Sequence, residues 1–226
     1  MKGKIIVIEG IDASGKGTQT KRLVEYLLES GKTVGTLDFP AYDRTPFGKI
    51  VGNFLNGDFC DPVAADPFAT TLLFSGDRLY ERERIKELVE THDYVILNRY
   101  VPSNIAYSCA KLRLLGRENE IVDFIHFNTQ LEYELLRLPK PDHVIVLDVS
   151  TDQADKQINT KGDREYIKDG ETRDKYETNR ALQREVVRAY HQLAKGRDSW
   201  SLLNCTGKTR DEVFELIKTC LTSKYQ

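Results

Sequence analysis

The sequence predicts an α/β fold in which a five-stranded parallel sheet is flanked by helices. Short apolar runs rich in β-branched residues alternate with longer segments whose apolar residues recur at helical spacing. The run 143–148 is apolar almost throughout, which is typical of a parallel strand that is buried on both faces. A chain of 226 residues fits one such domain, so residues 1–226 are expected to form a single domain.

The expected strands are short and are spread over the whole chain. They are residues 5–8, 33–39, 94–98, 143–148 and 200–204. Between them lie helical start and stop signals: Gly31 and Gly57 end two helices, and Asp66 followed by Pro67 begins a third. The expected helices are residues 15–30, 46–56, a long helix from 66 to about 91, 102–115, 118–136, 174–194 and 210–221.

The composition excludes several classes of protein. Thirty-three basic and thirty-five acidic residues give a net charge of −2, so there is no basic field for nucleic acid and no cationic block for a membrane surface. Mean hydropathy is −0.47, and no apolar run approaches a membrane span. No signal peptide is expected, because the first expected strand follows directly after Met1-Lys2-Gly3. The four cysteines are widely spaced without a Cys-x-x-Cys pair, which favours reduced thiols in a cytoplasmic protein over a metal site or a catalytic cysteine.

The loop between the first expected strand and the first helix is the most informative segment. Its glycines allow backbone N–H groups to converge on phosphate oxygens, the helix N-terminus adds positive potential, and a lysine reaches the outer phosphates. A second feature is Gly17, which stands where Ser or Thr usually ligates Mg²⁺, and this favours enzymes that phosphorylate nucleotides over switch GTPases. The residues predicted to bind nucleotide phosphates are Gly10, Ile11, Asp12, Ala13, Ser14, Gly15, Lys16, Gly17 and Thr18.

Further candidate residues follow the expected strands, because ligands bind at the carboxyl ends of parallel strands. Arg99 comes directly after the run 94–98, and its guanidinium suits an anionic phosphate. Asn104 can offer a donor and an acceptor to a pyrimidine edge. Phe74 and Arg78 are four residues apart on one helix face, so a ring lies beside a guanidinium that could read a base. The Phe74 ring could equally belong to the core, and Arg78 and Asn104 could equally be solvated surface residues.

Together these segments resemble the thymidylate kinase family, and the resemblance extends over nearly the whole chain. It implies a P-loop nucleoside monophosphate kinase fold with a lid at about residues 160–174. It also implies Mg²⁺-dependent transfer of the γ-phosphoryl group of ATP to dTMP, and a homodimer formed through helices. The helices 66–91 and 118–136 could form that interface, although their apolar faces could equally belong to the core. The motifs that carry it, besides the loop, are Phe39-Pro40-x-Tyr42, Phe74-x-x-Asp77-Arg78, Arg99-Tyr100-x-x-Ser103-Asn104-x-Ala106-Tyr107 and Arg173-Asp174-x-Tyr176-Glu177.

The resemblance implies roles in the binding of the dTMP base. Phe74 is expected to stack on thymine, and Arg78 is expected to bond a base carbonyl. Asn104 would read the pyrimidine edge, while Phe39 and Tyr42 would line the acceptor pocket.

It also implies roles around the sugar and the phosphates. Tyr107 would crowd the 2′ position of the sugar, and Asp12 would meet the 3′-hydroxyl or the metal. Arg99 would hold the acceptor phosphate, and Lys16 would serve the transferring phosphoryl group. The further catalytic cations expected from the lid are Arg164 and Arg173.

Two positions depart from the family pattern. Asn98 stands where the family usually has Asp, which predicts weaker metal binding unless Asp12, Asp174 or Glu177 compensates. Ala13 stands where some members carry an arginine, and in members without it the basic groups come from the lid. The basic residues of that segment are Lys161, Arg164, Lys168 and Arg173.

Three alternative functions are also compatible with parts of this pattern. A phosphate monoester is largely dianionic at neutral pH and needs no general base. A deoxynucleoside kinase acts on a neutral hydroxyl and needs a carboxylate, for which Asp38 is the candidate. A kinase for another pyrimidine monophosphate and an inactive nucleotide-binding scaffold would also use the phosphate loop.

Overall fold

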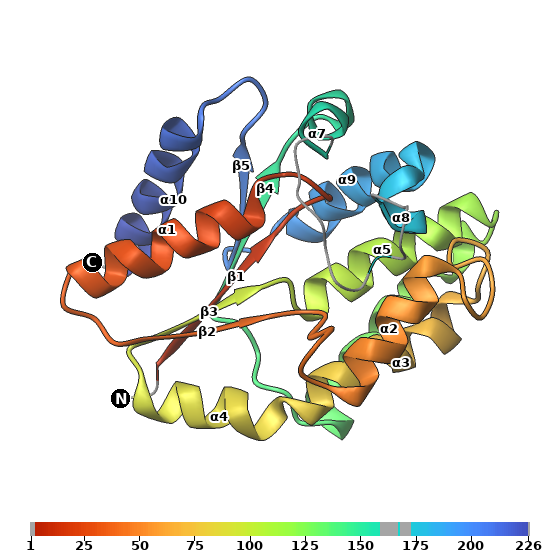
Figure 1. Cartoon of the computed structure of the whole chain (residues 1–226), viewed down its shortest axis with the longest axis horizontal. Coiled ribbons are helices and arrows are strands. Elements are labelled where there is room, and N and C mark those ends of the chain that lie inside the picture. Colours follow the sequence, from red (N-terminus) through yellow and green to blue (C-terminus); the bar gives the residue numbers. More distant parts are fainter. Residues whose placement is uncertain (1–2, 159–166, 168–172, 226) are drawn as a thin grey trace.

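The computed structural model describes residues 3–158, 167 and 173–225, and it contains the predicted five-stranded parallel sheet (Figure 1). The strand order is β2-β3-β1-β4-β5. The predicted strands are confirmed, three of them with the predicted bounds. The strands are β1 (Lys4–Glu9), β2 (Val34–Asp38), β3 (Tyr94–Asn98), β4 (His143–Asp148) and β5 (Trp200–Asn204).

The sheet is buried because helices cover both of its faces. β1 lies at its centre and pairs with β3 and β4, and along β1 only Lys4 is exposed. β4 is buried over its first five residues, as its apolar run predicts. Helices α1 (Lys16–Glu29) and α10 (Arg210–Tyr225) pack together on one face, and α5 (Val101–Leu114) packs against α9 (Arg180–Ala194) on the other (Figure 1). Because all of the strand pairs are parallel, the carboxyl ends of the strands lie along the same edge of the sheet.

The remaining elements surround that edge or extend the layers. α2 (Pro46–Asn56) follows β2. Its N-cap is Thr45, whose hydroxyl accepts a hydrogen bond from the Gly48 N–H. Such a cap satisfies one of the free N–H groups of the first turn. The other helices are α3 (Pro67–Tyr80), α4 (Arg82–Thr91), α6 (Ile121–Thr129), α7 (Thr151–Ile158) and α8 (Lys175–Thr178).

The prediction of one long helix from 66 to about 91 is wrong at its middle. The helix begins after Asp66, as expected, but it breaks at Glu81, which has φ −87° and ψ 0° and separates α3 from α4. The Glu81 carboxylate pairs with Arg44 at 3.3 Å. A break of one residue leaves an apolar face on both sides, so the periodicity does not reveal it.

Two other predicted helices also need correction, and one helix was not predicted. The helix expected at 118–136 is a 3₁₀ turn (Glu118–Glu120), then α6, then a π-helical turn (Gln130–Leu135). The helix expected at 174–194 is interrupted at Asn179, which accepts a hydrogen bond from Leu182 N–H as the cap of α9. Helix α7 was not predicted, because its segment is only eight residues long and mostly polar.

Some predictions concern residues outside the described part of the chain. Most of the predicted lid, including Arg164, Lys161 and Lys168, lies there, and Arg173 and Asp174 are described at its end. All four cysteines are free of disulfide bonds, as expected. Among the described residues, no helix combines the length and the apolar character that crossing a bilayer requires.

Candidate active site

The phosphate loop connects β1 to α1 and contains two glycines with positive φ, Gly10 at 143° and Gly15 at 91°. A Cβ atom on Gly10 would lie 2.7 Å from the Ser14 Oγ and 2.8 Å from the Leu147 carbonyl oxygen, so a larger residue does not fit. Gly15 is the N-cap of α1, which leaves the N–H groups of the first turn available for an anion.

Lys16 lies inside this loop rather than in solvent. Its ammonium donates hydrogen bonds to the carbonyl oxygens of Gly10 at 3.0 Å and Ile11 at 2.6 Å. The side chain is nearly buried. The backbone carbonyls of the loop therefore hold the Lys16 ammonium within the loop, which fits its predicted contact with a phosphate.

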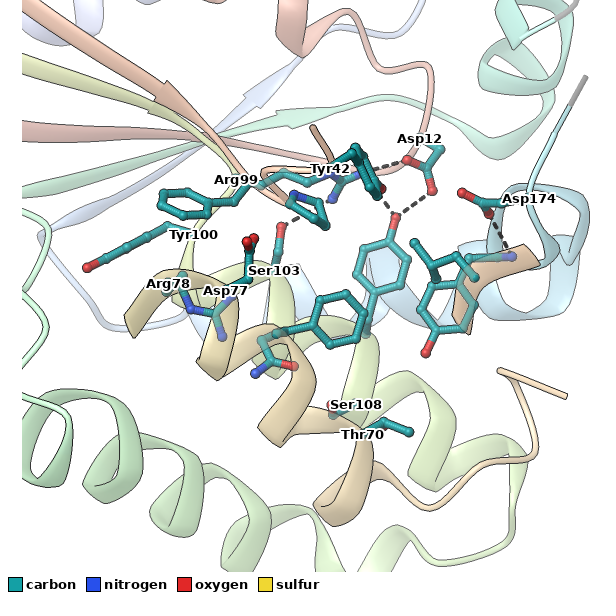
Figure 2. Close-up of a pocket in the computed structure, with 17 residues that line it drawn as sticks. Asp12, Tyr42, Thr70, Asp77, Arg78, Arg99, Tyr100, Ser103, Ser108 and Asp174 are labelled. Carbon is teal, nitrogen blue, oxygen red and sulfur yellow. Dashed lines mark hydrogen bonds and ion pairs between the residues drawn. The ribbon is translucent and has the colours of Figure 1, made fainter. Parts of the chain in front are cut away.

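A cavity opens beside the loop at the carboxyl ends of β1, β2 and β3 (Figure 2). Its open space, including the mouth, is about 670 Å³. The structure brings together in its wall every side chain that the sequence assigned to dTMP. These are Asp12, Phe39, Tyr42, Phe74, Arg78, Arg99, Asn104 and Tyr107.

Asp12 is the centre of a hydrogen-bonded cluster in this cavity (Figure 2). Arg99 Nη2 donates to Asp12 Oδ1 at 2.5 Å, and the Tyr107 hydroxyl donates to Oδ2 at 2.8 Å. Gln183, from α9, donates to the same Oδ2 at 3.0 Å, a contact that the sequence did not reveal. One carboxylate of the phosphate loop thus ties together the residue that follows β3, helix α5 and helix α9.

Burial and nearby charges keep these groups in the states that the cluster requires. Burial raises the pKa of Tyr107 well above its usual value, so its hydroxyl stays protonated and donates. Burial opposes the charge of Arg99, but nearby acidic groups, the Asp12 carboxylate among them, outweigh it and hold the Arg99 pKa well above its usual value. Arg99 also has φ 64°, a conformation that costs a non-glycine residue about 1–3 kcal/mol. A strained, permanently charged arginine at this edge points to a functional role.

Glu9 is a site residue that the sequence did not reveal. Its fully buried carboxylate accepts hydrogen bonds from the N–H groups of Tyr100 at 3.0 Å and Ser103 at 3.1 Å. The Tyr190 hydroxyl donates to it at 2.8 Å. Burial raises the Glu9 pKa. Glu9 therefore fixes the N-terminus of α5, and with it Arg99, against β1. The available signal was a glutamate that closes an otherwise apolar strand.

The far end of the cavity holds the residues predicted to read a base. Arg78 is 3 % exposed and forms an ion pair with the buried Glu132, so its reading as a solvated surface charge is wrong. Asn104 is buried as well, which rules out its reading as a solvated polar residue. The Phe74 ring lies edge-on to Phe54, with 6.4 Å between the ring centroids, and it lines the cavity.

Asp38, the candidate base of a nucleoside kinase, is exposed and does not line this cavity. Its backbone carbonyl accepts a hydrogen bond from Arg44 at 2.8 Å. Nothing in its position supports proton abstraction from a hydroxyl held among the cavity residues.

A second cavity lies on the other side of the phosphate loop. The loop contributes Ala13, Ser14, Gly15 and Thr18 to it. The opposite wall comes from the segments that follow β4 and β5 and includes Lys208 and Arg210, which were not among the predicted site residues. Nothing in the sequence pointed to them, because two basic residues in a polar turn do not by themselves indicate a binding site. The loop therefore separates two cavities and contributes to both, since Asp12 lines the first.

Comparison with known proteins decides the family. The family model for thymidylate kinase matches residues 8–217. The chain belongs to the thymidylate kinase family. Thymidylate kinases are ATP-dependent nucleoside monophosphate kinases, and membership makes the reaction of this chain the phosphorylation of dTMP to dTDP.

Individual thymidylate kinases match over most of their length. The chain is 35 % identical over 190 residues to a thymidylate kinase of Mycobacterium tuberculosis, covering 84 % of this chain and 85 % of the relative. It is 29 % identical over 218 residues to that of Homo sapiens, covering 96 % and 89 %. The solved thymidylate kinase of Candida albicans superposes with a TM-score of 0.72 at 26 % identity, covering 98 % of this chain and 92 % of that one.

Proposed function

We propose that the two cavities hold the two substrates, with dTMP on the side of Asp12 and ATP on the side of Thr18. The observation that carries this assignment is the gathering of the predicted acceptor residues in one cavity, next to the phosphate loop. The loop then lies where the triphosphate of ATP and the phosphate of dTMP must approach each other.

The acceptor nucleotide is bound along the cavity from base to phosphate. Phe74 stacks on thymine, while Arg78 and Asn104 bond the base edge. Tyr107 stands against the sugar, and its ring stacks on that of Tyr176 at 5.5 Å and 15°, which makes a flat wall that leaves little room for a 2′-hydroxyl. Arg99 meets the acceptor phosphate. Phe39 and Tyr42 close the side of the pocket that follows β2.

Transfer itself requires the neutralisation of charge rather than a general base. The acceptor phosphate is already nucleophilic as a dianion, so the site must align two anions and stabilise the charge that moves to the leaving group. Lys16 and the loop N–H groups face the donor phosphates, and Arg99 faces the acceptor. Arg173, which directly precedes the cavity residue Asp174, and Arg164 from the lid supply the remaining cations. The whole chain 1–226 acts as one domain with a lid at about 160–174.

The residues of the first cavity fit a Mg²⁺ ion. The carboxylates of Asp12 and Asp174 both line it, and Mg²⁺ prefers one or two carboxylates together with phosphate oxygens and water. The described residues hold no group of three or more His, Cys, Asp and Glu side chains suited to a metal, so phosphate and water oxygens would complete the coordination. Bound Mg²⁺ would neutralise charge on the phosphates of ATP. Asp12 is therefore the primary candidate ligand.

A coupled assay of ADP release tests this function. The protein is given Mg²⁺-ATP and, in turn, dTMP, dUMP, dCMP and thymidine. We expect the highest kcat/KM with dTMP and no turnover with thymidine, which lacks the phosphate that Arg99 would hold. Turnover with thymidine in preference to dTMP would support a deoxynucleoside kinase instead. ATP binding without turnover of any acceptor would support an inactive scaffold.

A homodimer in the cytoplasm completes the proposal. α3 and α6 lie side by side, with the rings of Phe68 and Phe124 5.1 Å apart. The same elements and the π-helical turn expose Leu72, Val122 and Leu135, the last two by 75 % and 73 %. Exposed apolar side chains on neighbouring elements favour burial against a second copy. Sedimentation of the wild type and of Val122→Glu tests it, with a dimer expected for the first and a monomer for the second.

A further inference from the structure

Glu132 is a fully buried carboxylate at the base end of the first cavity, and it has no part in the proposed contacts with either substrate. It comes from the π-helical turn (Gln130–Leu135), a conformation that is rare and often found at functional sites. Ser75 Oγ donates to its Oε1 at 2.7 Å, and Arg78 Nε donates to its Oε2 at 3.1 Å. Asn104 Nδ2 donates to Oε1 at 3.3 Å. One carboxylate thus contacts both residues proposed to read the base.

The carboxylate decides which way the Asn104 amide points. An ionised carboxylate only accepts hydrogen bonds, so the amide nitrogen must face Glu132. The same nitrogen donates to Thr71 Oγ1 at 2.5 Å, and Asn128 donates to that oxygen at 2.7 Å from the other side. With its nitrogen engaged in this buried network, Asn104 presents its carbonyl oxygen, an acceptor, to the cavity that it lines.

The carboxylate also decides what Arg78 presents. Its Nε and Nη2 are engaged with Glu132, while Nη1 donates no hydrogen bond to the described residues and is left for the cavity. Burial alone would lower the Arg78 pKa, but the charge of Glu132 outweighs it and raises that pKa. Arg78 is therefore a fixed donor beside the acceptor of Asn104.

This pattern matches one class of pyrimidine. Thymine and uracil carry an N–H donor at N3 and a carbonyl acceptor at C4, which pair with the acceptor of Asn104 and the donor of Arg78. Cytosine carries an acceptor at N3 and an amino donor at C4, so both contacts become unfavourable. A site that holds polar groups in fixed orientations rejects a mismatched analogue strongly, because buried polar groups are left unpaired.

We propose that Glu132 is a positioning residue that selects 4-oxo over 4-amino pyrimidine monophosphates by fixing the hydrogen-bonding pattern of Asn104 and Arg78. This rests on the proposed binding of the dTMP base in the first cavity. Glu132 does not contact the base in this arrangement. It acts through the two residues that do.

Glu132→Gln tests the proposal, with kcat/KM measured for dTMP and for dCMP and with the Kd of ATP measured separately. The glutamine can donate an N–H to Asn104, which allows the amide to turn over. We expect the ratio of kcat/KM for dTMP to that for dCMP to fall roughly tenfold or more, with an unchanged Kd for ATP. A parallel loss with both acceptors, at an unchanged ratio, would overturn the proposal and leave Glu132 a merely structural role.

Two further variants complete the test. Ser75→Ala removes a hydrogen bond from Glu132 without touching Arg78 or Asn104, and it should keep the wild-type ratio. If Glu132→Gln does not fold, Glu132→Asp retains the charge but withdraws it from Asn104, and the ratio should fall roughly threefold or more. An unchanged ratio in Glu132→Asp contradicts the proposal. Wild-type protein that uses dTMP and dCMP equally also defeats it, whereas wild-type protein inactive with dTMP defeats the proposed function itself.

Discussion

The guanidinium of Arg99 and the carboxylate of Asp12 are joined by a hydrogen bond of 2.5 Å between Nη2 and Oδ1, and this pair links the phosphate loop to the segment after β3 in the wall of the first cavity. β1 and β3 are neighbouring parallel strands, so the residues that follow them meet at the same edge of the sheet. Arg99 directly follows β3, and Asp12 lies in the loop that follows β1. An arriving phosphate would find a cation already placed at the junction of the two cavities.

Arg99→Ala should damage the acceptor side of the reaction. Removing one charge that meets the transferring groups commonly costs about 3 kcal/mol of barrier, or a loss of about a hundredfold in kcat/KM. We expect that loss with dTMP as the varied substrate, together with a nearly unchanged Kd for ATP. Arg84→Ala, which removes an exposed arginine on α4, is the matched control and should behave as wild type. Unaltered dTMP kinetics in Arg99→Ala would remove Arg99 from the acceptor site.

Lys16→Ala should abolish turnover and leave the fold intact. The ammonium contacts the Gly10 and Ile11 carbonyls, so its loss affects the loop and its charge but not the core. We expect kcat to fall by about a hundredfold or more, with a circular dichroism spectrum like that of the wild type. Lys21→Ala, on the exposed side of α1, is the control. Wild-type kcat in Lys16→Ala would show that the loop lysine has no part in transfer.

Asp77→Asn should weaken both acceptor binding and stability. Asp77 is buried on α3, and its Oδ2 accepts a hydrogen bond from the Ala41 N–H at 2.9 Å. Its Oδ1 accepts one from Thr45, the cap of α2. Asp77 therefore fixes the turn that carries Phe39 and Tyr42. An asparagine that places its NH₂ group against either donor costs about 1–3 kcal/mol. Urea unfolding and the KM for dTMP measure the two effects.

If only one of the two effects appears, Asp77 does not have this role. A variant as stable as the wild type but unable to bind dTMP would mean that the carboxylate meets the ligand itself. A destabilised variant with an unchanged KM for dTMP would mean that the turn holds its shape without Asp77.

The sequence predicted what depends on local pattern and on the ends of strands. β3, β4 and β5 have the predicted bounds because their apolar runs are short and clearly delimited. Arg99 and Asn104 could be identified because parallel strands deliver the residues that follow them to one edge. The loop could be identified from the glycines and the lysine that lie between an apolar strand and a helix, and at Gly10 the structure leaves no room for a Cβ atom.

The remaining features depend on contacts between distant segments, which periodicity does not encode. Glu132 lies 54 positions from Arg78 and reads as an ordinary helical glutamate until the π-helical turn buries it. Glu9 is recognisable only once Tyr190 and the N-terminus of α5 surround it. The break at Glu81 separates α3, which lines the cavity, from α4, which packs on β3.

Lys111 supports a last prediction, which concerns stability and pH. This lysine of α5 is 1 % exposed, and Thr70 Oγ1, 3.3 Å away, accepts a hydrogen bond from its ammonium. The rings of Phe54 and Tyr176 lie 5.7 and 5.8 Å from it. Burial lowers its pKa from 10.5 to about 8, although Asp66, Cys60 and Asp61 favour the charge. The folded protein therefore holds the Lys111 proton less tightly than the unfolded chain does.

The sign of the effect follows from that difference. Below the folded pKa of about 8, both states bind the proton and the folded state bears the full cost of burying the charge. As the pH rises from about 8 to 10.5, the folded state releases the proton first and the cost disappears. A shift of this size corresponds to about 3 kcal/mol. The contribution of Lys111 to the free energy of unfolding thus becomes less unfavourable as the pH rises.

Lys111→Met should therefore stabilise the protein near neutral pH. Methionine fills a similar volume without a charge, so we expect its free energy of unfolding to exceed that of the wild type by about 1–3 kcal/mol near pH 7. The gain should shrink towards zero near pH 10. Urea unfolding of both proteins at the two pH values measures the difference between their free energies of unfolding. The contributions of titrating groups that both proteins share cancel in this difference. A gain that is the same at both values would mean that folding does not lower the Lys111 pKa, and a loss near pH 7 would mean that its contacts with Thr70 and the two rings outweigh the cost of burial.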